Sequence, residues 1–291
     1  MPKRRDLTVD STSVSSGVLH ERMHPRLTEA HRREFWENGV TVVRQLIPHE
    51  WIPHLEQAAE ENRRVAAGEI DEGLFVDTEH HSEGFLFGNE TWRYNSRLRE
   101  FIFKSDIADV AAFILDSREI RLYEDIFIYK AAGTAVPTDF HQDEPQLGTT
   151  GRQVCNIWFS LEPVTEVSGA LRIVPGSHNG PQYTPRMPEG REDDAEEFAG
   201  GPLPDPELEP ERFPIRSFDL DLGDAIIFHP LALHGSRSGV LERPRRTFSL
   251  RFVGDDIRWI QRRSAYHTWV RDMPLSTGAR LEHELFPLLR S

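Results

Sequence analysis

The sequence contains a single cysteine, Cys155, and no long apolar run. One cysteine excludes an intramolecular disulfide and a zinc site built from several cysteines. No stretch approaches the roughly eighteen consecutive apolar residues that a membrane-spanning helix needs, and residues 1–24 lack the apolar middle of a signal peptide. A basic excess is also missing, because 34 lysines and arginines face 48 acids in 291 residues, a net charge of −14. We therefore expect a cytoplasmic protein that binds neither nucleic acid nor membrane.

What is present suffices for a folded core, since 38% of the residues are hydrophobic and 10% are aromatic. We expect a flexible polar tail over residues 1–24 and a single domain over 25–291. Helical periodicity covers about 27–38, continues after Pro48 to about residue 67, and returns over about 99–115. Strand patterns follow, with an early one before the second helix: 40–46, 121–130, 154–161, 170–174, 218–222, 225–228 and 247–253.

Many short strands with Gly and Pro turns predict a barrel or sandwich, so the fold class is mainly β with N-terminal helices. Residues 68–95 are interpreted as a loop anchored by Phe75, Phe85 and Phe87, which either close over a substrate or belong to the core. Residues 185–212 are rich in Pro, Gly and acids, which predicts a solvated insertion or a lid.

Three candidate metal ligands stand out: His141, Asp143 and His234. His141 and Asp143 follow a predicted strand, and side chains two apart in an extended chain point to the same face. His234 lies beyond the apolar strand 225–228 and would approach from another wall. Two histidines and one carboxylate on one face of a metal leave open positions, as in non-haem Fe(II) oxygenases.

Chance matches to this pattern are expected in a chain with 13 histidines and 48 acids. His54-x-Glu56 lies on a predicted helix, where residues two apart diverge. His81-x-Glu83 lies in a loop without a strand frame. We therefore discount both and favour the triplet at 141–143, which has a strand before it and a third ligand beyond it.

The identity of the ligands also separates reaction types. Halogenases of this design lack the carboxylate and place halide there, so Asp143 favours hydroxylation or another oxidation. A co-substrate with a distal carboxylate needs a buried bidentate cation, and Arg245 fits that role, with Ser236 adding a hydroxyl. By strand parity Arg243 shares the face of Arg245, whereas Arg246 points the other way, to the surface. Arginines dominate from 243 to 271, and we interpret most of them as solvated charges.

At these residues the sequence resembles the phytanoyl-CoA 2-hydroxylase family of Fe(II)/2-oxoglutarate dioxygenases. The resemblance rests on ordered blocks over about residues 25–290, and the main ones are Phe140-His141-Gln142-Asp143, 154–161, Ser168-Gly169-Ala170-Leu171, Val174-Pro175-Gly176-Ser177-His178, Leu222-Gly223-Asp224, His234-Gly235-Ser236 and Arg243-Pro244-Arg245-Arg246.

The resemblance implies a double-stranded β-helix, or cupin-like jelly roll, with N-terminal helices packed on one sheet. It implies iron on His141, Asp143 and His234, and 2-oxoglutarate anchored by Arg245 with Ser236. Trp158 and Gln142 are expected beside the co-substrate. His178 and His229 are interpreted as structural, although His229 lies close enough to support the metal indirectly.

The predicted function is therefore oxygenation, most simply hydroxylation, of a small organic substrate with dioxygen and 2-oxoglutarate, releasing succinate and carbon dioxide. Two alternatives stay open: a cupin-type metalloenzyme that does not use 2-oxoglutarate, and a non-catalytic jelly-roll binding module. The substrate, the oxidised position and the choice between monomer and homodimer are not readable from the sequence.

Overall fold

A computed structural model describes residues 26–70, 84–185, 198–237, 239–262, 270 and 272–291. The predicted tail at 1–24, Phe75, the pair His81 and Glu83, and residues 186–197 of the predicted insertion lie outside these ranges. Within them, no helix combines the length and the apolar character needed to cross a membrane.

The strands form two main antiparallel sheets and a two-stranded ribbon. The larger sheet runs in the order β1 (Val40–Val43), β9 (Ala225–Phe228), β6 (Val154–Ser160), β11 (Arg245–Val253), β3 (Ile120–Lys130) and β13 (Leu288–Arg290), with β2 (Phe85–Asn89) also paired to β3. The smaller sheet runs β4 (Thr138–His141), β10 (His234–Ser236), β7 (Leu171–Ile173) and β8 (Arg216–Ser217). The ribbon joins β5 (Thr149–Thr150) to β12 (Arg258–Trp259).

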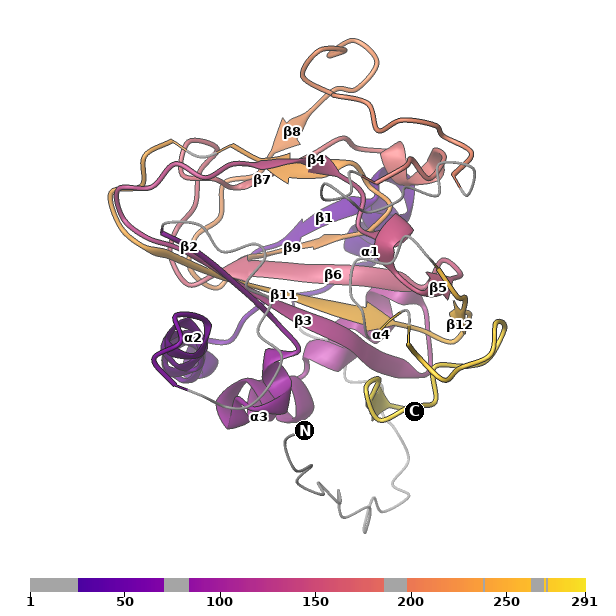
Figure 1. Ribbon diagram of the computed structural model, residues 1–291, viewed down its shortest axis with the longest axis horizontal. Helices are drawn as coiled ribbons and strands as arrows, with labels where there is room; N and C mark the ends of the chain where they lie inside the picture. Colours follow the sequence, from indigo (N-terminus) through magenta and orange to yellow (C-terminus); the bar gives the residue numbers. More distant parts are fainter. Residues whose placement is uncertain (1–25, 71–83, 186–197, 238, 263–269, 271) are drawn as a thin grey trace.

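The helices come early in the chain and cover the larger sheet. They are α1 (Glu29–Asn38), α2 (Ile52–Ala66), α3 (Ser96–Lys104) and α4 (Ile107–Leu115), with short 3-10 turns η1 (His49–Trp51), η2 (Thr91–Arg93), η3 (Glu144–Gln146) and η4 (Ser177–Asn179). In Figure 1, α2 and α3 lie on the side of the larger sheet that faces away from β4 and β7. Helices and strands hold similar shares of the described chain. The protein is thus mixed α/β with antiparallel sheets, which corrects the mainly-β prediction.

Strand β6 shows how one sheet separates the core from the site. Ile157 and Phe159 belong to the apolar cluster that includes Leu55 of α2 and Phe101 of α3, and Phe101 contacts Phe159 edge-on with ring centroids 6.0 Å apart. Because neighbours along a strand point to opposite faces, Trp158 projects to the other side, into a separate apolar cluster between the sheets. The helices therefore fix the outer face of the sheet and leave its inner face for the site.

Three predicted segments differ in detail from the observed ones. The helix expected over 99–115 is two helices, because Ser105 is extended (φ −79°, ψ 174°) and its hydroxyl donates to Phe101 O, 2.6 Å away. The segment 218–222 forms no strand and contributes only an isolated bridge from Leu220 to Val164. Part of the loop expected over 68–95 is strand β2, which pairs along its length with β3.

Candidate metal and co-substrate site

The two histidines of the candidate metal site lie on neighbouring strands. His141 ends β4 and His234 begins β10, and the two residues are register partners in the smaller sheet. Their ring centroids are 4.2 Å apart. Antiparallel pairing thus brings together two side chains that are far apart in the sequence.

Asp143 reaches the two histidines from a turn after β4, and not from an extended strand as expected. It lies beyond β4 in a helical conformation (φ −77°, ψ −40°), so the strand-parity argument for the pair His141 and Asp143 is wrong. Its backbone N–H donates to Pro230 O at 2.8 Å, which ties it to the segment that leads to His234. Asp143 Oδ1 lies 3.2 Å from His141 Nε2 and 3.6 Å from His234 Nε2. The three ligand atoms all lie within 4.8 Å of one another.

Both imidazoles present the same nitrogen to this point. His141 Nδ1 donates to Asp139 O at 2.8 Å, and His234 Nδ1 donates to Ala232 O at 2.9 Å. A carbonyl acceptor on Nδ1 leaves the lone pair on Nε2, which is how metal-binding histidines are commonly oriented. Two imidazole nitrogens and one carboxylate oxygen are the donor set that fits a non-haem ferrous ion.

The second oxygen of Asp143 is held by residues that sequence analysis missed. Arg251 Nη2 donates to Asp143 Oδ2 at 2.6 Å, and Asn156 Nδ2 donates to the same oxygen at 2.8 Å. Arg251 also pairs with the buried Glu124 and donates to Asn156 Oδ1 at 2.8 Å. Strand parity is the sequence signal that could have indicated Arg251. This residue shares the strand face of Arg245 and lies between Leu250 and Phe252 in an apolar run.

Electrostatics favours an ionised carboxylate at this point. Burial alone would raise the pKa of Asp143, but Arg251 and the two histidines outweigh it and hold that pKa well below its ordinary value. Burial, together with neighbouring His141, lowers the pKa of His234 to about 4. Neutral His234 and ionised Asp143 are the protonation states that ligate a metal. Burial would lower the pKa of His141 as well, but the neighbouring Asp143 outweighs burial and raises that pKa, so a metal ion would compete with a proton at this imidazole.

The metal ligands open into a cavity of about 410 Å³ between the two sheets. Trp158, Ser236 and Arg245, which are expected from the sequence to lie beside the co-substrate, line the same cavity, and Phe85 and Phe87 line it too. The lining also contains six further apolar side chains, together with polar and charged ones such as Glu124 and Arg251; the apolar ones are Ile126, Ile128, Phe140, Leu147, Leu171 and Phe228.

Arg245 is held in place by a turn that requires glycine. Its Nη1 donates to Ser168 O at 2.9 Å and to Gly169 O. Gly169 has φ +92°, and a Cβ there would overlap Arg245 Nη1. Arg246, in contrast, pairs with Glu162 at 2.6 Å on the other face, and Arg243 is exposed and precedes β11. The Ser-Gly block of the sequence thus shapes the Arg245 site.

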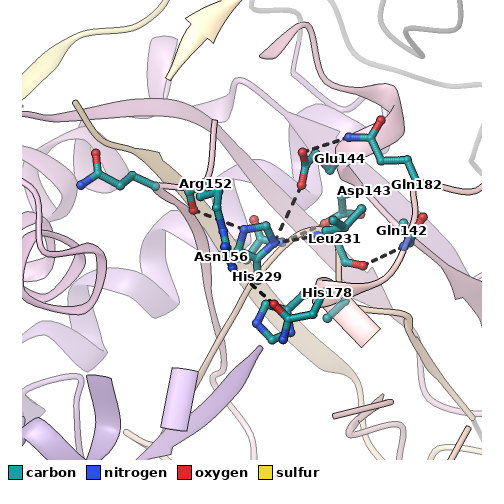
Figure 2. Close-up of polar contacts among 12 residues, drawn as sticks. Gln142, Asp143, Glu144, Arg152, Asn156, His178, Gln182, His229 and Leu231 are labelled. Atoms are coloured by element: carbon teal, nitrogen blue, oxygen red, sulfur yellow. Dashed lines mark hydrogen bonds and ion pairs between the residues drawn. The ribbon is translucent and has the colours of Figure 1, made fainter. Parts of the chain in front are cut away.

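Gln142, predicted beside the co-substrate, lies outside the lining of the cavity. Its amide donates to Leu231 O at 2.8 Å and accepts from Tyr183 N at 2.9 Å. It therefore braces the segment before His234. Figure 2 shows this region beside the buried His229, whose Nδ1 accepts from Leu231 N at 3.1 Å.

The remaining histidines considered in the sequence have other partners. His229 Nε2 lies 3.3 Å from Arg152 O, and its Nδ1 lies 3.8 Å from Glu144 Oε2. His178 Nε2 lies 3.1 Å from Trp36 O and helps to hold α1. His54, on α2, lies 3.3 Å from Glu100 of α3.

Comparison with protein families agrees with this geometry. The family model for phytanoyl-CoA dioxygenase (PhyH) matches residues 35–247, so the chain belongs to the phytanoyl-CoA dioxygenase family. It is 28% identical over 171 residues to a phytanoyl-CoA dioxygenase of Arabidopsis thaliana, covering 56% of this chain and 57% of the relative. It is 27% identical over 104 residues to a probable phytanoyl-CoA dioxygenase of Caenorhabditis elegans, covering 36% and 32%. These matches span between about a third and just over half of the relatives' lengths.

Solved structures resemble the fold over most of its length. The carbocyclase SnoK from nogalamycin biosynthesis has a TM-score of 0.69 at 20% identity, covering 91% of this chain and 98% of that one. EctD from S. alaskensis, solved with 2-oxoglutarate and 5-hydroxyectoine, has a TM-score of 0.65 at 18% identity, with 88% of each chain covered. At these identities the likeness shows a shared fold.

Proposed function

We propose that this protein is a non-haem Fe(II)/2-oxoglutarate-dependent oxygenase that hydroxylates a small organic substrate, with release of succinate and carbon dioxide. The observation that carries the proposal is the convergence of His141, Asp143 and His234 at one end of a cavity whose other end holds the buried Arg245. Family membership supports it independently.

Different residues of the site would bind the metal, the co-substrate and the substrate. His141, Asp143 and His234 would hold iron by one face, and the bound iron would supply the oxidative chemistry. Arg245, with the hydroxyl of Ser236, would bind the distal carboxylate of 2-oxoglutarate and orient it toward the metal. The apolar lining excludes water and favours a substrate with a largely apolar body.

Several finer assignments belong to this proposal. We infer that the two facing sheets form a double-stranded β-helix, which the likeness to SnoK and EctD supports. We also propose one dioxygenase domain over 25–291, with 185–212 as an insertion or lid. A cytoplasmic location stays a prediction from composition.

Anaerobic spectroscopy tests the proposal. Fe(II) and 2-oxoglutarate added to the protein should give a weak visible charge-transfer band, which a binding module or a cupin that ignores 2-oxoglutarate would not produce. Asp143→Ala should abolish that band and substrate-coupled succinate formation. Asp109→Ala removes an exposed carboxylate of α4, 3.0 Å from Arg290, and serves as the control. Full activity in Asp143→Ala would overturn the metal assignment. A succinate-release screen against small acids, amino acids, terpenoids and acyl-CoAs would then identify the substrate.

A further inference from the structure

The last residue of β3, Lys130, is a fully buried lysine. Its Nζ donates to Val136 O and lies over the ring of Phe85, 5.7 Å from the centroid. Within the described ranges, no carboxylate contributes to the electrostatic environment of this amine; burial and the neighbouring Arg245 are the causes that lower its pKa, to about 7. Burying a cation without an anionic partner lowers the stability of the folded protein. A bound anionic ligand would offset that loss.

Strand register places Lys130 between two residues of the cavity. Phe85 of β2 and Arg245 of β11 are both register partners of Lys130, on opposite sides of β3. Both partners line the cavity. Glu124, Ile126 and Ile128, at alternate positions of the same strand, line it as well, so Lys130 has the parity of that face. Lys130 itself is not one of the lining residues: its amine lies directly behind the cavity wall, over the Phe85 ring and next to Arg245.

Arg245 is also a cation without a carboxylate at contact distance in the described part of the chain. Its Nη1 donates only to backbone carbonyls, and its buried Nε has no hydrogen-bond partner. Glu162 acts on it from a distance, since that carboxylate pairs with Arg246. Burial lowers the pKa of Arg245 to about 10. The charge of Arg245 disfavours the protonated form of Lys130, and an anion bound beside Arg245 would favour that form again.

We propose that Lys130, behind the cavity wall and beside Arg245, supplies a second positive charge that stabilises the distal carboxylate of 2-oxoglutarate, and that it sets the preference for a dicarboxylic 2-oxo acid. This inference rests on the proposed function. Phe85 covers the Lys130 amine, and exclusion of water strengthens the attraction between that charge and a nearby carboxylate. Lys130 is thus a specificity-determining residue, and it takes no part in the oxidation itself.

The test compares two 2-oxo acids that differ only at the far end. Under anaerobic conditions, the Fe(II)-loaded protein is titrated with 2-oxoglutarate and with 2-oxopentanoate, which carries a methyl group in place of the distal carboxylate. Lys130→Met should weaken 2-oxoglutarate binding roughly tenfold to a hundredfold, because it removes one partner of a buried charge pair. The affinity for 2-oxopentanoate should change less than about threefold, because that ligand carries no charge at its far end.

Two further variants keep the result interpretable. Lys130→Gln retains a donor for Val136 O while removing the charge, so it tests the charge even if Lys130→Met fails to fold. Lys104→Met removes an exposed lysine of α3, 2.8 Å from Glu100, and should change neither affinity.

Each alternative outcome is decisive. Equal losses for both 2-oxo acids would show that Lys130 only shapes the fold, and unchanged 2-oxoglutarate affinity would show that its charge does not act on the co-substrate; either result overturns this inference alone. The absence of any charge-transfer band in the wild-type protein would instead overturn the proposed function.

Discussion

The two ends of the cavity differ in how their charges are balanced. At the metal end, Asp143 and the buried Glu124 are both paired with Arg251, and Asn156 completes the network. At the proposed co-substrate end, Arg245 and Lys130 are adjacent buried basic side chains that donate to backbone carbonyls and have no carboxylate at contact distance among the described residues. The same strand, β11, supplies an arginine to each end. The chain therefore compensates its own charges around the candidate metal ligands, and leaves positive charge uncompensated at the end that we propose binds the distal carboxylate of 2-oxoglutarate.

This contrast has an energetic consequence. A paired buried network loses stability when one member is removed, because the remaining charges are left without compensation. An unpaired buried cation costs stability in the free protein and returns it when its anion binds. Substitutions at the two ends should therefore affect the free protein in different ways.

The largest effect is expected at Arg251. Arg251→Met would leave Glu124 and Asp143 as uncompensated buried carboxylates, so the free energy of unfolding should fall by about 3–5 kcal/mol. Urea unfolding of the metal-free protein measures this. Arg246→Met, on the same strand but half-exposed beside Glu162, should cost about 1 kcal/mol or less. Similar losses for the two variants would contradict a charge-balanced metal end.

An intermediate effect is expected at Gly169. Gly169→Ala combines a backbone at φ +92° with an overlap between the new Cβ and Arg245, so we expect a loss of about 1–3 kcal/mol and weaker 2-oxoglutarate binding. Gly278→Ala has a nearly equal φ of +89° with no atom within 4 Å, and isolates the backbone strain. Calorimetric titration should show the 2-oxoglutarate affinity reduced only in the first variant. If Gly278→Ala weakens binding as much, the Ser-Gly turn has no special role in placing Arg245.

The smallest effect on the free protein is expected at Arg245 itself. Arg245→Met removes an unpaired buried cation, so the free energy of unfolding without ligands should stay within about 1 kcal/mol of the wild-type value or rise. In the wild-type protein, co-substrate at a hundredfold excess over Kd should raise the free energy of unfolding by about 2.7 kcal/mol. In Arg245→Met this increase should disappear. Urea unfolding with and without Fe(II) and 2-oxoglutarate, under anaerobic conditions, gives both numbers. A loss above about 3 kcal/mol in the free protein would mean that Arg245 is compensated within the chain.

Sequence reasoning located the residues with distinctive chemistry. His141, Asp143 and His234 do converge, although the argument for Asp143 was wrong because the chain leaves the strand after His141. Arg245 and Trp158 line the cavity, and their contact with the co-substrate stays a prediction. Gln142 does not line the cavity, and its place between two ligands in the sequence says nothing about which way its amide turns.

The supporting residues were out of reach for a different reason. The arginine-rich composition of residues 243–271 predicts only a solvated charge at Arg251. Lys130 is the last residue of a predicted strand and belongs to no motif. Their roles depend on cross-strand partners: Arg251 is opposite Glu124, and Lys130 is opposite Arg245. Register between distant strands is set by the packing of whole sheets, which local patterns do not encode.

The sequence by itself determined which groups were available for chemistry: two imidazoles, a carboxylate and a guanidinium, in the order and spacing of a known family. The tertiary structure alone decided which of the many charged side chains are buried, which of those are paired, and which lie next to each other without a counter-charge. The physical reason is that a side chain's type is local, whereas its charge balance depends on every strand packed against it.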